Sequence, residues 1–320
     1  MKKFLRKTAL FSTIIIIPLI IFFIYLPDPV IQNSLLGSII EKNAMLAKTE
    51  SPKIILAGGS NVSFGFNSKK IIDAYKLPVV NTAITIDLGL KFIINDIKPY
   101  VRKGDIVILS TDYRYYYDDP IYFEGSESLV ATVFDVFPEG RNYIDLKQWG
   151  YLLQWLPFYT SSKITTAMRE LRGHKVKLDL NDVYGLKSFN QYGDAYIHWN
   201  KPNVKFKPEE KCTGNEILNP DIIPFLIEFN KYVSSKGATL VLIPPPLDAA
   251  SFDDRYFIIN KIDSSLRKNG LPFITNPIRY KFATKYFFNN PYHLNKAGAD
   301  KRTELVIEDI SKIIYIETSK

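Results

Sequence analysis

Cysteine is nearly absent from this chain of 320 residues, in which Cys212 stands alone. A single cysteine excludes an intrachain disulfide framework and a metal site built from several cysteines. Histidine is scarce as well, with three residues, so there is little material for a histidine-built metal centre. The 16 glycines and 19 prolines are too few for a collagen-like or low-complexity protein. Glycine motifs of the Walker or Rossmann type are missing, and we expect neither a metal nor an organic cofactor.

The net charge of +8 is concentrated at one end of the chain. Residues 1–27 contain four basic side chains and no acidic one, which leaves 37 basic and 33 acidic residues in the remainder. No basic stripe with interleaved aromatic residues is left after this subtraction, so we expect no nucleic-acid partner. The hydrophobic share of 46% and the charged share of 23% are ordinary for a folded globular protein.

Residues 8–26 (TALFSTIIIIPLIIFFIYL) form an uncharged apolar run that is long enough to cross a hydrocarbon core of about 30 Å as a helix. Basic residues precede the run, and the positive-inside rule then keeps the N-terminus in the cytoplasm. A cleaved signal peptide is the alternative, but the run is longer than usual and no A-x-A-like cleavage site follows it. We therefore predict a single-pass anchor in the cytoplasmic membrane, with residues 1–27 as tip and anchor and the body in the periplasm or extracellular space.

Beyond a stalk at residues 28–52, short apolar runs alternate with amphipathic helical segments. Strands are expected at residues 53–57, 78–81, 105–110, 239–243 and 272–275. This alternation predicts an α/β fold, a three-layer α/β/α sandwich with a mostly parallel five-stranded sheet, over residues 53–320. An aromatic-rich insertion at about residues 113–220 interrupts the pattern, and we interpret it as a lid on the sheet or as a carbohydrate-facing surface.

Two polar segments fall at the carboxyl ends of predicted strands, where α/β folds place their active sites. Ser60 follows Gly58-Gly59 directly after the first strand and opens a helix, so its hydroxyl is a candidate nucleophile. Backbone N–H groups at Gly59 and Asn61 would then lie where an oxyanion forms. The alternative is that Ser60 only caps the helix.

The second segment precedes the last predicted helix and contains His293. A histidine in a loop at a helix start is a candidate general base, with an ordinary surface histidine as the alternative. The pairing of a glycine-glycine-serine turn after the first strand with a histidine before the last helix favours the catalytic interpretation.

These two segments resemble the blocks of the SGNH (GDSL-type) hydrolase superfamily, in its membrane-anchored acyltransferase-like branch. That branch includes proteins of teichoic-acid D-alanyl transfer and of alginate O-acetylation. The family's first block is Gly-Asp-Ser, and its last is Asp-x-x-His-Leu-Asn-x-x-Gly. This chain has Gly58-Gly59-Ser60 and, from His293 to Gly298, HLNKAG. The resemblance implies that Ser60 is the nucleophile and His293 the base.

The chain departs from the family blocks at four places. Gly59 replaces the Asp of the first block, and Ala83 replaces the oxyanion glycine of the second block. Asp112 replaces the oxyanion asparagine of the third block, where its carboxylate would repel an oxyanion. The Asp of the triad is replaced by Asn290 or by Asn289, three and four residues before the histidine.

A further segment, from Asn190 to Asp194 and followed by His198, resembles one seen between the central blocks of anchored members and is another possible site.

Two functions remain open. One is an esterase or O-acyltransferase acting on a cell-envelope glycan or polymer through Ser60 and His293. The other is a catalytically degenerate subunit that binds an envelope polymer or a polytopic membrane O-acyltransferase.

Overall fold

The computed structural model describes residues 1–320 except 27, 118, 175–178, 210 and 319–320, and it gives no side chains at 19–25 and 312–318. The strands are β1 (Ile54–Gly58), β2 (Val79–Asn81), β3 (Ile106–Ser110), β4 (Thr239–Leu242), β5 (Leu247–Asp248) and β6 (Lys281–Phe282). The helices are α1 (Lys2–Tyr25), α2 (Pro29–Gln32), α3 (Ile39–Lys48), α4 (Ser60–Ser63), α5 (Ser68–Tyr75), α6 (Leu90–Ile97), α7 (Arg114–Tyr117), α8 (Ile121–Glu124), α9 (Glu127–Ala131), α10 (Leu146–Leu152), α11 (Leu156–Leu171), α12 (Ile222–Ser235), α13 (Ala249–Asp254), α14 (Tyr256–Lys268) and α15 (Lys296–Thr318).

The central sheet has four strands in the order β2-β1-β3-β4, and all three pairings are parallel. This confirms the predicted α/β class with a mostly parallel sheet. The predicted fifth strand is wrong, because residues 272–275 make only an isolated bridge between Phe273 and Leu242. Leu242 exchanges hydrogen bonds with Pro272 O and the Ile274 N–H, but Pro272 has no N–H with which to continue the ladder toward the start of β4.

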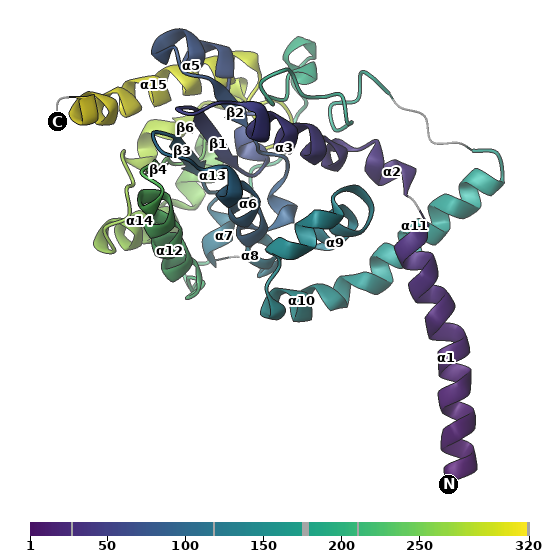
Figure 1. Ribbon diagram of the computed structural model, residues 1–320. Coiled ribbons are helices and arrows are strands. Elements are labelled where there is room, and N and C mark those ends of the chain that lie inside the picture. The colour runs from purple at the N-terminus through teal and green to yellow at the C-terminus, as the bar shows by residue number, and fades with distance from the viewer. Residues whose placement is uncertain (27, 118, 175–178, 210, 319–320) are drawn as a thin grey trace.

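Helices cover both faces of the sheet (Figure 1). Successive strand residues point to opposite faces, so Ile55 and Ala57 of β1 join one hydrophobic cluster and Ile54 and Leu56 join the other. The first cluster is completed by α6, α12 and α14, and the second by α5 and α15. Because both faces are buried, the strands are apolar almost throughout, which is why the sequence marks them clearly.

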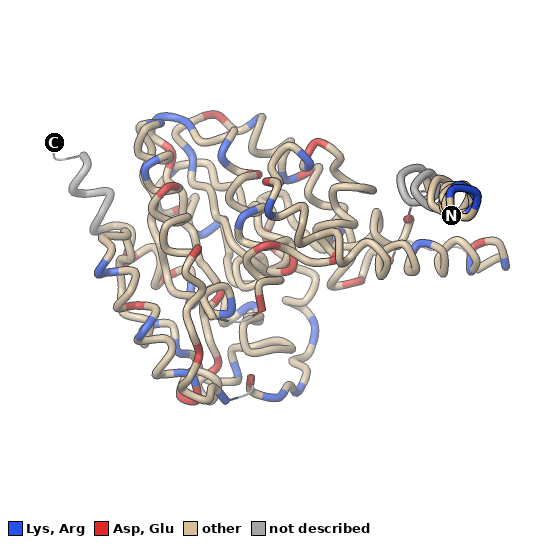
Figure 2. The backbone as a smooth tube through the Cα atoms, turned by 90° about the horizontal axis from the view of Figure 1, so that it is seen from below, with Lys and Arg blue, Asp and Glu red and all other residues tan. Residues whose placement is uncertain are grey.

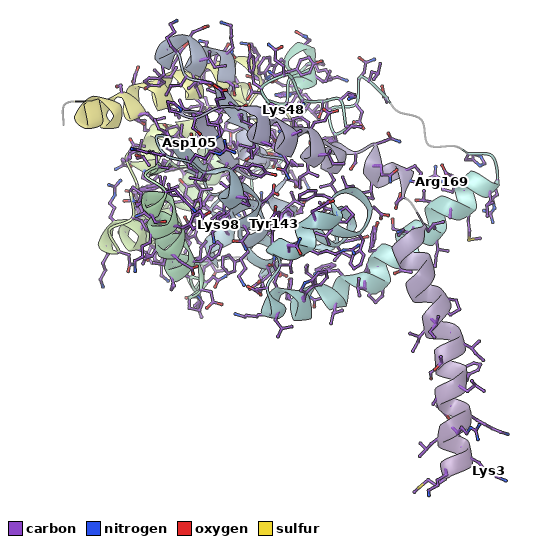
Figure 3. All side chains as sticks on the ribbon, in the orientation of Figure 1. Lys3, Lys48, Lys98, Asp105, Tyr143 and Arg169 are labelled. Atoms are coloured by element: carbon purple, nitrogen blue, oxygen red, sulfur yellow. The ribbon has the colours of Figure 1, made fainter. Side chains whose placement is uncertain are left out.

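Helix α1 projects away from the body, with Lys3 near its far end (Figures 1 and 3). Figure 2 shows basic residues gathered at this N-terminal tip, whereas charges of both signs are spread over the body. Within the part of the chain that the structure describes, no helix is both long enough and apolar enough to cross a membrane. The span predicted at residues 8–26 includes positions 19–25, whose side chains lie outside the described residues.

Helix α3, which lies in the segment predicted as a stalk, packs against β2 and buries Ile39, Lys42 and Leu46. The segment predicted as an insertion contains α7 to α11 and a long irregular stretch that leads to α12. Tyr115 and Tyr116 of its aromatic run are buried in the core, so this part of the segment packs on the sheet.

A buried ion pair joins the starts of β1 and β3. Lys53 Nζ lies 2.8 Å from Asp105 Oδ2, and neither side chain is exposed. Asp105, labelled in Figure 3, also accepts hydrogen bonds from the backbone N–H groups of Lys53 and Arg102. Loss of one partner would leave an uncompensated buried charge, which is costly.

We expect Asp105→Asn to lower the free energy of unfolding by about 3–5 kcal/mol, because it leaves the Lys53 ammonium buried without a counter-charge. Urea unfolding followed by circular dichroism measures the change. Asp73→Asn is the matched control, since it breaks an ion pair with Lys69 that is more than half exposed on both sides and should have no measurable effect. An equal decrease in the free energy of unfolding in the two variants would contradict the conclusion that the Lys53–Asp105 pair is the buried, stabilising one.

Candidate active site

Ser60 is the first residue of α4, which begins immediately after β1 and a single glycine. Gly59 is the N-cap residue of this helix, so the interpretation of Ser60 as the cap is wrong. The Ser60 side chain is half-buried, and it lies at the carboxyl edge of the parallel sheet. A hydroxyl in this position can reach a ligand in front of the sheet.

The two glycines before Ser60 are required by close packing. Gly58 has a φ of 149°, and a Cβ there would lie 2.5 Å from the carbonyl oxygen of Ser110. At Gly59 a Cβ would lie 3.1 Å from the Cα and Cβ atoms of Ile86. A side chain at position 59 would therefore require Ile86 to shift by a few tenths of an ångström.

His293 lies in a loop that precedes α15 and is closed by the bridge between Phe287 and Leu294. Asn290 holds this loop, because its Oδ1 accepts the backbone N–H groups of Tyr292 and His293 at 2.8 and 2.9 Å. The role of Asn290 is thus to fix the loop, and its side chain is not the partner of the imidazole.

Asn289 is the residue that faces the imidazole. Its Oδ1 lies 3.0 Å from Nδ1 of His293, and its Nδ2 donates to the hydroxyl of Tyr184 at 2.6 Å. With the amide oriented in this way, Nδ1 carries the proton and donates to Asn289. The Nε2 atom is then an acceptor, as a general base requires.

The imidazole of His293 is buried and packed against aromatic rings. It stacks on Phe64 with the ring centroids 4.2 Å apart, and Phe64 also contacts His198 with centroids 4.7 Å apart. Burial lowers the pKa of His293 to about 3, and the nearby His198 and Arg114 add to the decrease. Burial likewise lowers the pKa of His198 to about 4. Both histidines are therefore neutral at physiological pH.

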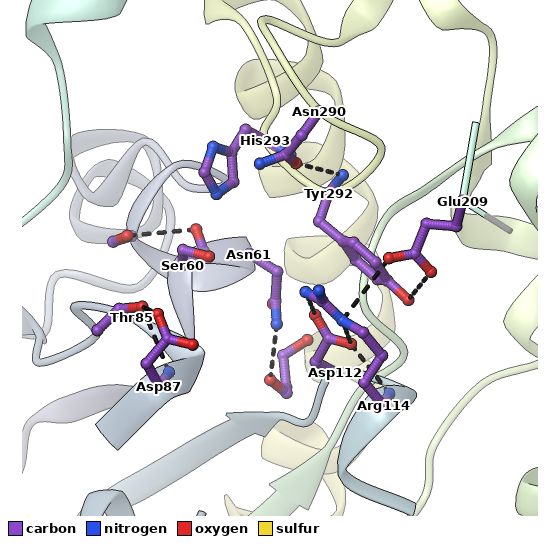
Figure 4. Close-up of polar contacts among 12 residues, drawn as sticks. Ser60, Asn61, Thr85, Asp87, Asp112, Arg114, Glu209, Asn290, Tyr292 and His293 are labelled. Atoms are coloured by element: carbon purple, nitrogen blue, oxygen red, sulfur yellow. Dashed lines mark hydrogen bonds and ion pairs between the residues drawn. The ribbon is translucent and has the colours of Figure 1, made fainter. Parts of the chain in front are cut away.

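Ser60 and His293 line one pocket of about 300 Å³. Its other walls come from Leu35, Phe64, Ile84, Thr85, Ile86, Asp87, Arg114, Tyr122, Tyr184 and Asn290. Figure 4 shows the imidazole above Ser60 and Arg114 on the other side of the pocket. No hydrogen bond joins Ser60 Oγ to His293 in the described chain, as is common in sites without substrate.

Asp112 lies behind this pocket, buried and neutralised by Arg114. Its Oδ1 and Oδ2 accept from Nε and Nη2 of Arg114 at 3.1 and 3.0 Å. The carboxylate that was expected to repel an oxyanion is thus paired with a cation, and the pair as a whole carries no net charge. Arg114 itself reaches the pocket wall.

Neither Ala83 nor Asn61 lines the pocket. The N–H of Ala83 donates to Asn81 Oδ1, and its carbonyl accepts from Lys42, so this backbone is not available to an oxyanion. Asn61 is buried, and its side chain donates to the carbonyl of Ser110 at 3.4 Å. Residues 84–87 form the pocket wall in place of Ala83.

The Asn190–Asp194 segment forms a buried structural clamp. The Asp194 carboxylate accepts hydrogen bonds from Ser68 and from Asn81, while Asn190 closes the turn by accepting the N–H of Asp194. His198 lies apart from this clamp, with its Nε2 2.9 Å from the carbonyl oxygen of Leu294, the residue after His293. Asn190 and Asp194 thus support the edge of the sheet, and His198 supports the loop that carries His293.

Arg114, Tyr184 and Phe64 are site residues that the sequence did not reveal. Phe64 caps the short helix that Ser60 opens, and its spacing of four residues was a local signal that was missed. Arg114 and Tyr184 are distant from Ser60 in sequence, so only the fold brings them to this pocket. A second pocket of about 430 Å³ holds neither Ser60 nor His293. Its lining includes Tyr117, Tyr151, Glu124, Lys147, Asn219 and Asp221.

Comparison with known proteins yields no assignment. No family model matches the chain, and no curated protein matches its sequence.

The low pKa of His293 predicts that stability decreases on acidification. Below about pH 6.5 the unfolded chain binds a proton at this histidine, whereas the folded protein binds it only near pH 3. The free energy of unfolding should therefore fall between pH 7 and pH 5, by at most about 1.4 kcal/mol per pH unit for this one proton. Urea titrations of wild type and His293→Gln at both pH values measure the effect, and the variant should fall less. Identical pH dependence in the two proteins would show that the buried imidazole is protonated.

Proposed function

We propose that this protein is a membrane-anchored, extracytoplasmic esterase or O-acyltransferase of SGNH type, acting on a cell-envelope glycan or polymer. The observation that carries the proposal is the shared pocket of Ser60 and His293, with Nδ1 of His293 held by Asn289 Oδ1. This arrangement supplies a nucleophile, a base with its free nitrogen available, and a group that orients the base. The resemblance of the GGS turn and the HLN loop to the family blocks supports the same chemistry.

The reaction takes place in two halves. His293 Nε2 accepts the proton of Ser60 as Oγ attacks the acyl carbonyl, and the tetrahedral intermediate expels the alcohol, which takes the proton from His293. The acyl group then rests on Ser60. Water or a glycan hydroxyl gives its proton to His293, attacks the acyl-serine and leaves as the acid or as the new ester, while Ser60 regains its proton.

A glycan substrate is supported by the second pocket. Tyrosine rings of residues 117 and 151 offer flat apolar faces there, and Asn219 and Asp221 offer polar groups for hydroxyls. Tyr117 also accepts a hydrogen bond from Arg255 at 3.0 Å, which connects this pocket to the charged residues behind the first one. A polymer lying across both pockets would present one of its hydroxyls to Ser60.

The alternative is a non-catalytic subunit that binds an envelope polymer or a polytopic membrane O-acyltransferase. The observation in its favour is that Ser60 Oγ and His293 share no hydrogen bond within the described residues. Hydrolysis of p-nitrophenyl acetate by the full-length chain in detergent distinguishes the enzyme from the non-catalytic subunit. Activity that is lost in Ser60→Ala and in His293→Ala supports the enzyme, whereas activity that survives Ser60→Ala excludes Ser60 as the nucleophile.

We expect Asn289→Asp to raise kcat for p-nitrophenyl acetate, because a carboxylate would stabilise the imidazolium that forms during attack. The reverse change in a serine protease lowers kcat ~10⁴-fold, since its amide holds the wrong tautomer. Here Asn289 Oδ1 already holds the correct tautomer, so the gain should be smaller, roughly ten- to a hundred-fold. Steady-state kinetics of the full-length chain measures it.

Asn290→Asp is the matched control. It puts a carboxylate on the neighbouring residue and keeps the oxygen that accepts the N–H groups of Tyr292 and His293, but it does not face Nδ1. Its kcat should stay within a few-fold of wild type. An equal rise in both variants would show that general negative charge, and not the contact with Nδ1, sets the rate.

The uncharged run at residues 8–26 and the basic tip before it support a topology with the N-terminus in the cytoplasm. Protease added to intact spheroplasts should therefore digest the body beyond Asp28 and leave a short N-terminal fragment. A cytoplasmic protein detected in the same sample controls for lysis. Full protection of the body under these conditions would refute the proposed location.

A further inference from the structure

Arg114 is the cation of the candidate pocket, and it is held in a fixed orientation. Asp112 accepts from its Nε and Nη2, and the backbone N–H of Arg114 also donates to Asp112 Oδ1 at 3.0 Å. The carbon at the centre of the guanidinium lies 5.0 Å from the ring centroids of both Tyr122 and Tyr292. A carboxylate in its plane and two rings near it leave the guanidinium little freedom to rotate.

One edge of this guanidinium is not used by the protein. Nη1 of Arg114 makes no hydrogen bond with any residue that the structure describes, and the side chain is 22% exposed where it meets the pocket. Figure 4 shows the guanidinium across the pocket from His293, with Asn61 between it and Ser60. Arg114 therefore has an N–H donor without a protein partner, on a side chain that lines the same pocket as Ser60 and His293.

The charges behind Arg114 alternate in sign. Glu209 lies 3.7 Å from Nε of Arg114 and 3.1 Å from Nε of Arg255, so Asp112, Arg114, Glu209 and Arg255 together carry no net charge. Burial alone would lower the pKa of Arg114, but Asp112 and Glu209 raise it above its ordinary value, so the guanidinium stays charged.

We propose that Arg114, through Nη1, stabilises the negative charge on the carbonyl oxygen of the tetrahedral intermediate formed at Ser60. It would do the work of the oxyanion asparagine, whose place in the third block is taken by Asp112. Asp112 then orients Arg114 and balances its charge in the ground state. This inference rests on the proposed function, because it requires Ser60 to attack an acyl group.

The chemistry favours this role over simple substrate binding. A fixed donor aimed at a developing charge lowers the barrier without binding the ground state more tightly. Because the charged cluster is neutral as a whole, its effect is largest on a charge that appears only during the reaction. A loss of Arg114 should therefore appear in kcat and leave KM nearly unchanged.

The test uses the full-length chain in detergent with p-nitrophenyl acetate, and a fluorophosphonate probe that counts reactive Ser60. We expect Arg114→Gln to lower kcat by ~10²–10³-fold, as the removal of one oxyanion donor does in other enzymes. Arg114→Lys keeps the positive charge but loses the Nη1 edge, so it should also lose at least about tenfold. KM should change less than about threefold in both.

Arg279→Lys is the matched control, because Arg279 is also paired with a buried carboxylate, that of Asp309, but lies outside the charged cluster and does not line the pocket with Ser60. Its kcat should stay within about twofold of wild type. Thermal unfolding of each variant identifies any that do not fold. If Arg114→Gln does not fold, the kcat of Arg114→Lys tests the proposal.

Three results would overturn the inference. A kcat restored to the wild-type value in Arg114→Lys would mean that only the ion pair matters. A raised KM with unchanged kcat would mean that Arg114 binds the substrate in its ground state. A wild-type chain that neither hydrolyses the ester nor reacts with the probe at Ser60 would refute the proposed function itself, and the inference with it.

Discussion

A buried arginine, which has no carboxylate partner among the residues that the structure describes, joins the parts of the candidate site. Arg302 of α15 donates from Nη1 to the carbonyl of Asn61 at 2.5 Å and from Nη2 to Ser110 Oγ at 2.7 Å. It also lies over the ring of Phe66, and burial lowers its pKa to about 9. Helix α15, which follows the loop of His293, is thereby connected to Asn61 beside Ser60 and to Ser110 at the end of β3. Arg302 thus adds two buried hydrogen bonds to the hydrophobic packing that joins these three segments.

Around His293 the candidate site is built from uncharged or paired groups. His293 is uncharged, its partner is an amide, and the carboxylate of Asp112 is balanced by Arg114. Asp87 also lines the pocket, and its carboxylate accepts a hydrogen bond from the Thr85 hydroxyl. An unpaired charge packed directly against the buried imidazole would be costly. Asn289 fits this pattern, because an aspartate at that position would bury a charge beside a histidine that the surroundings keep neutral.

The sequence predicted the local parts of this arrangement and missed the long-range ones. A glycine turn after the first apolar run and a histidine before the last helix are signals within a few residues, and the structure brings Ser60 and His293 to one pocket. Spacing alone left Asn289 and Asn290 open, because four and three residues both allow contact across a loop. Arg114 carries no such signal, since only the pairing with Asp112 and the two tyrosine rings directs it toward the pocket. The fifth strand was overpredicted because an apolar run does not reveal that Pro272 interrupts the hydrogen-bond ladder.

The amide at position 289 bears on the choice between an acyl-transfer site and a binding-only subunit. An asparagine in place of the triad acid is damaging when its amino group faces the imidazole, because Nδ1 then accepts and Nε2 carries the proton. In this protein the Tyr184 hydroxyl takes the amino group, so the carbonyl of Asn289 faces Nδ1. Tyr184 comes from the insertion, far from Ser60 and His293 in sequence, and in the observed arrangement it accepts from the amino group of Asn289 while the carbonyl faces Nδ1. Nε2 of His293 is then the nitrogen that can accept a proton. A subunit that only binds a polymer has no need for that tautomer, so this contact supports the proposed acyl transfer over the binding-only alternative.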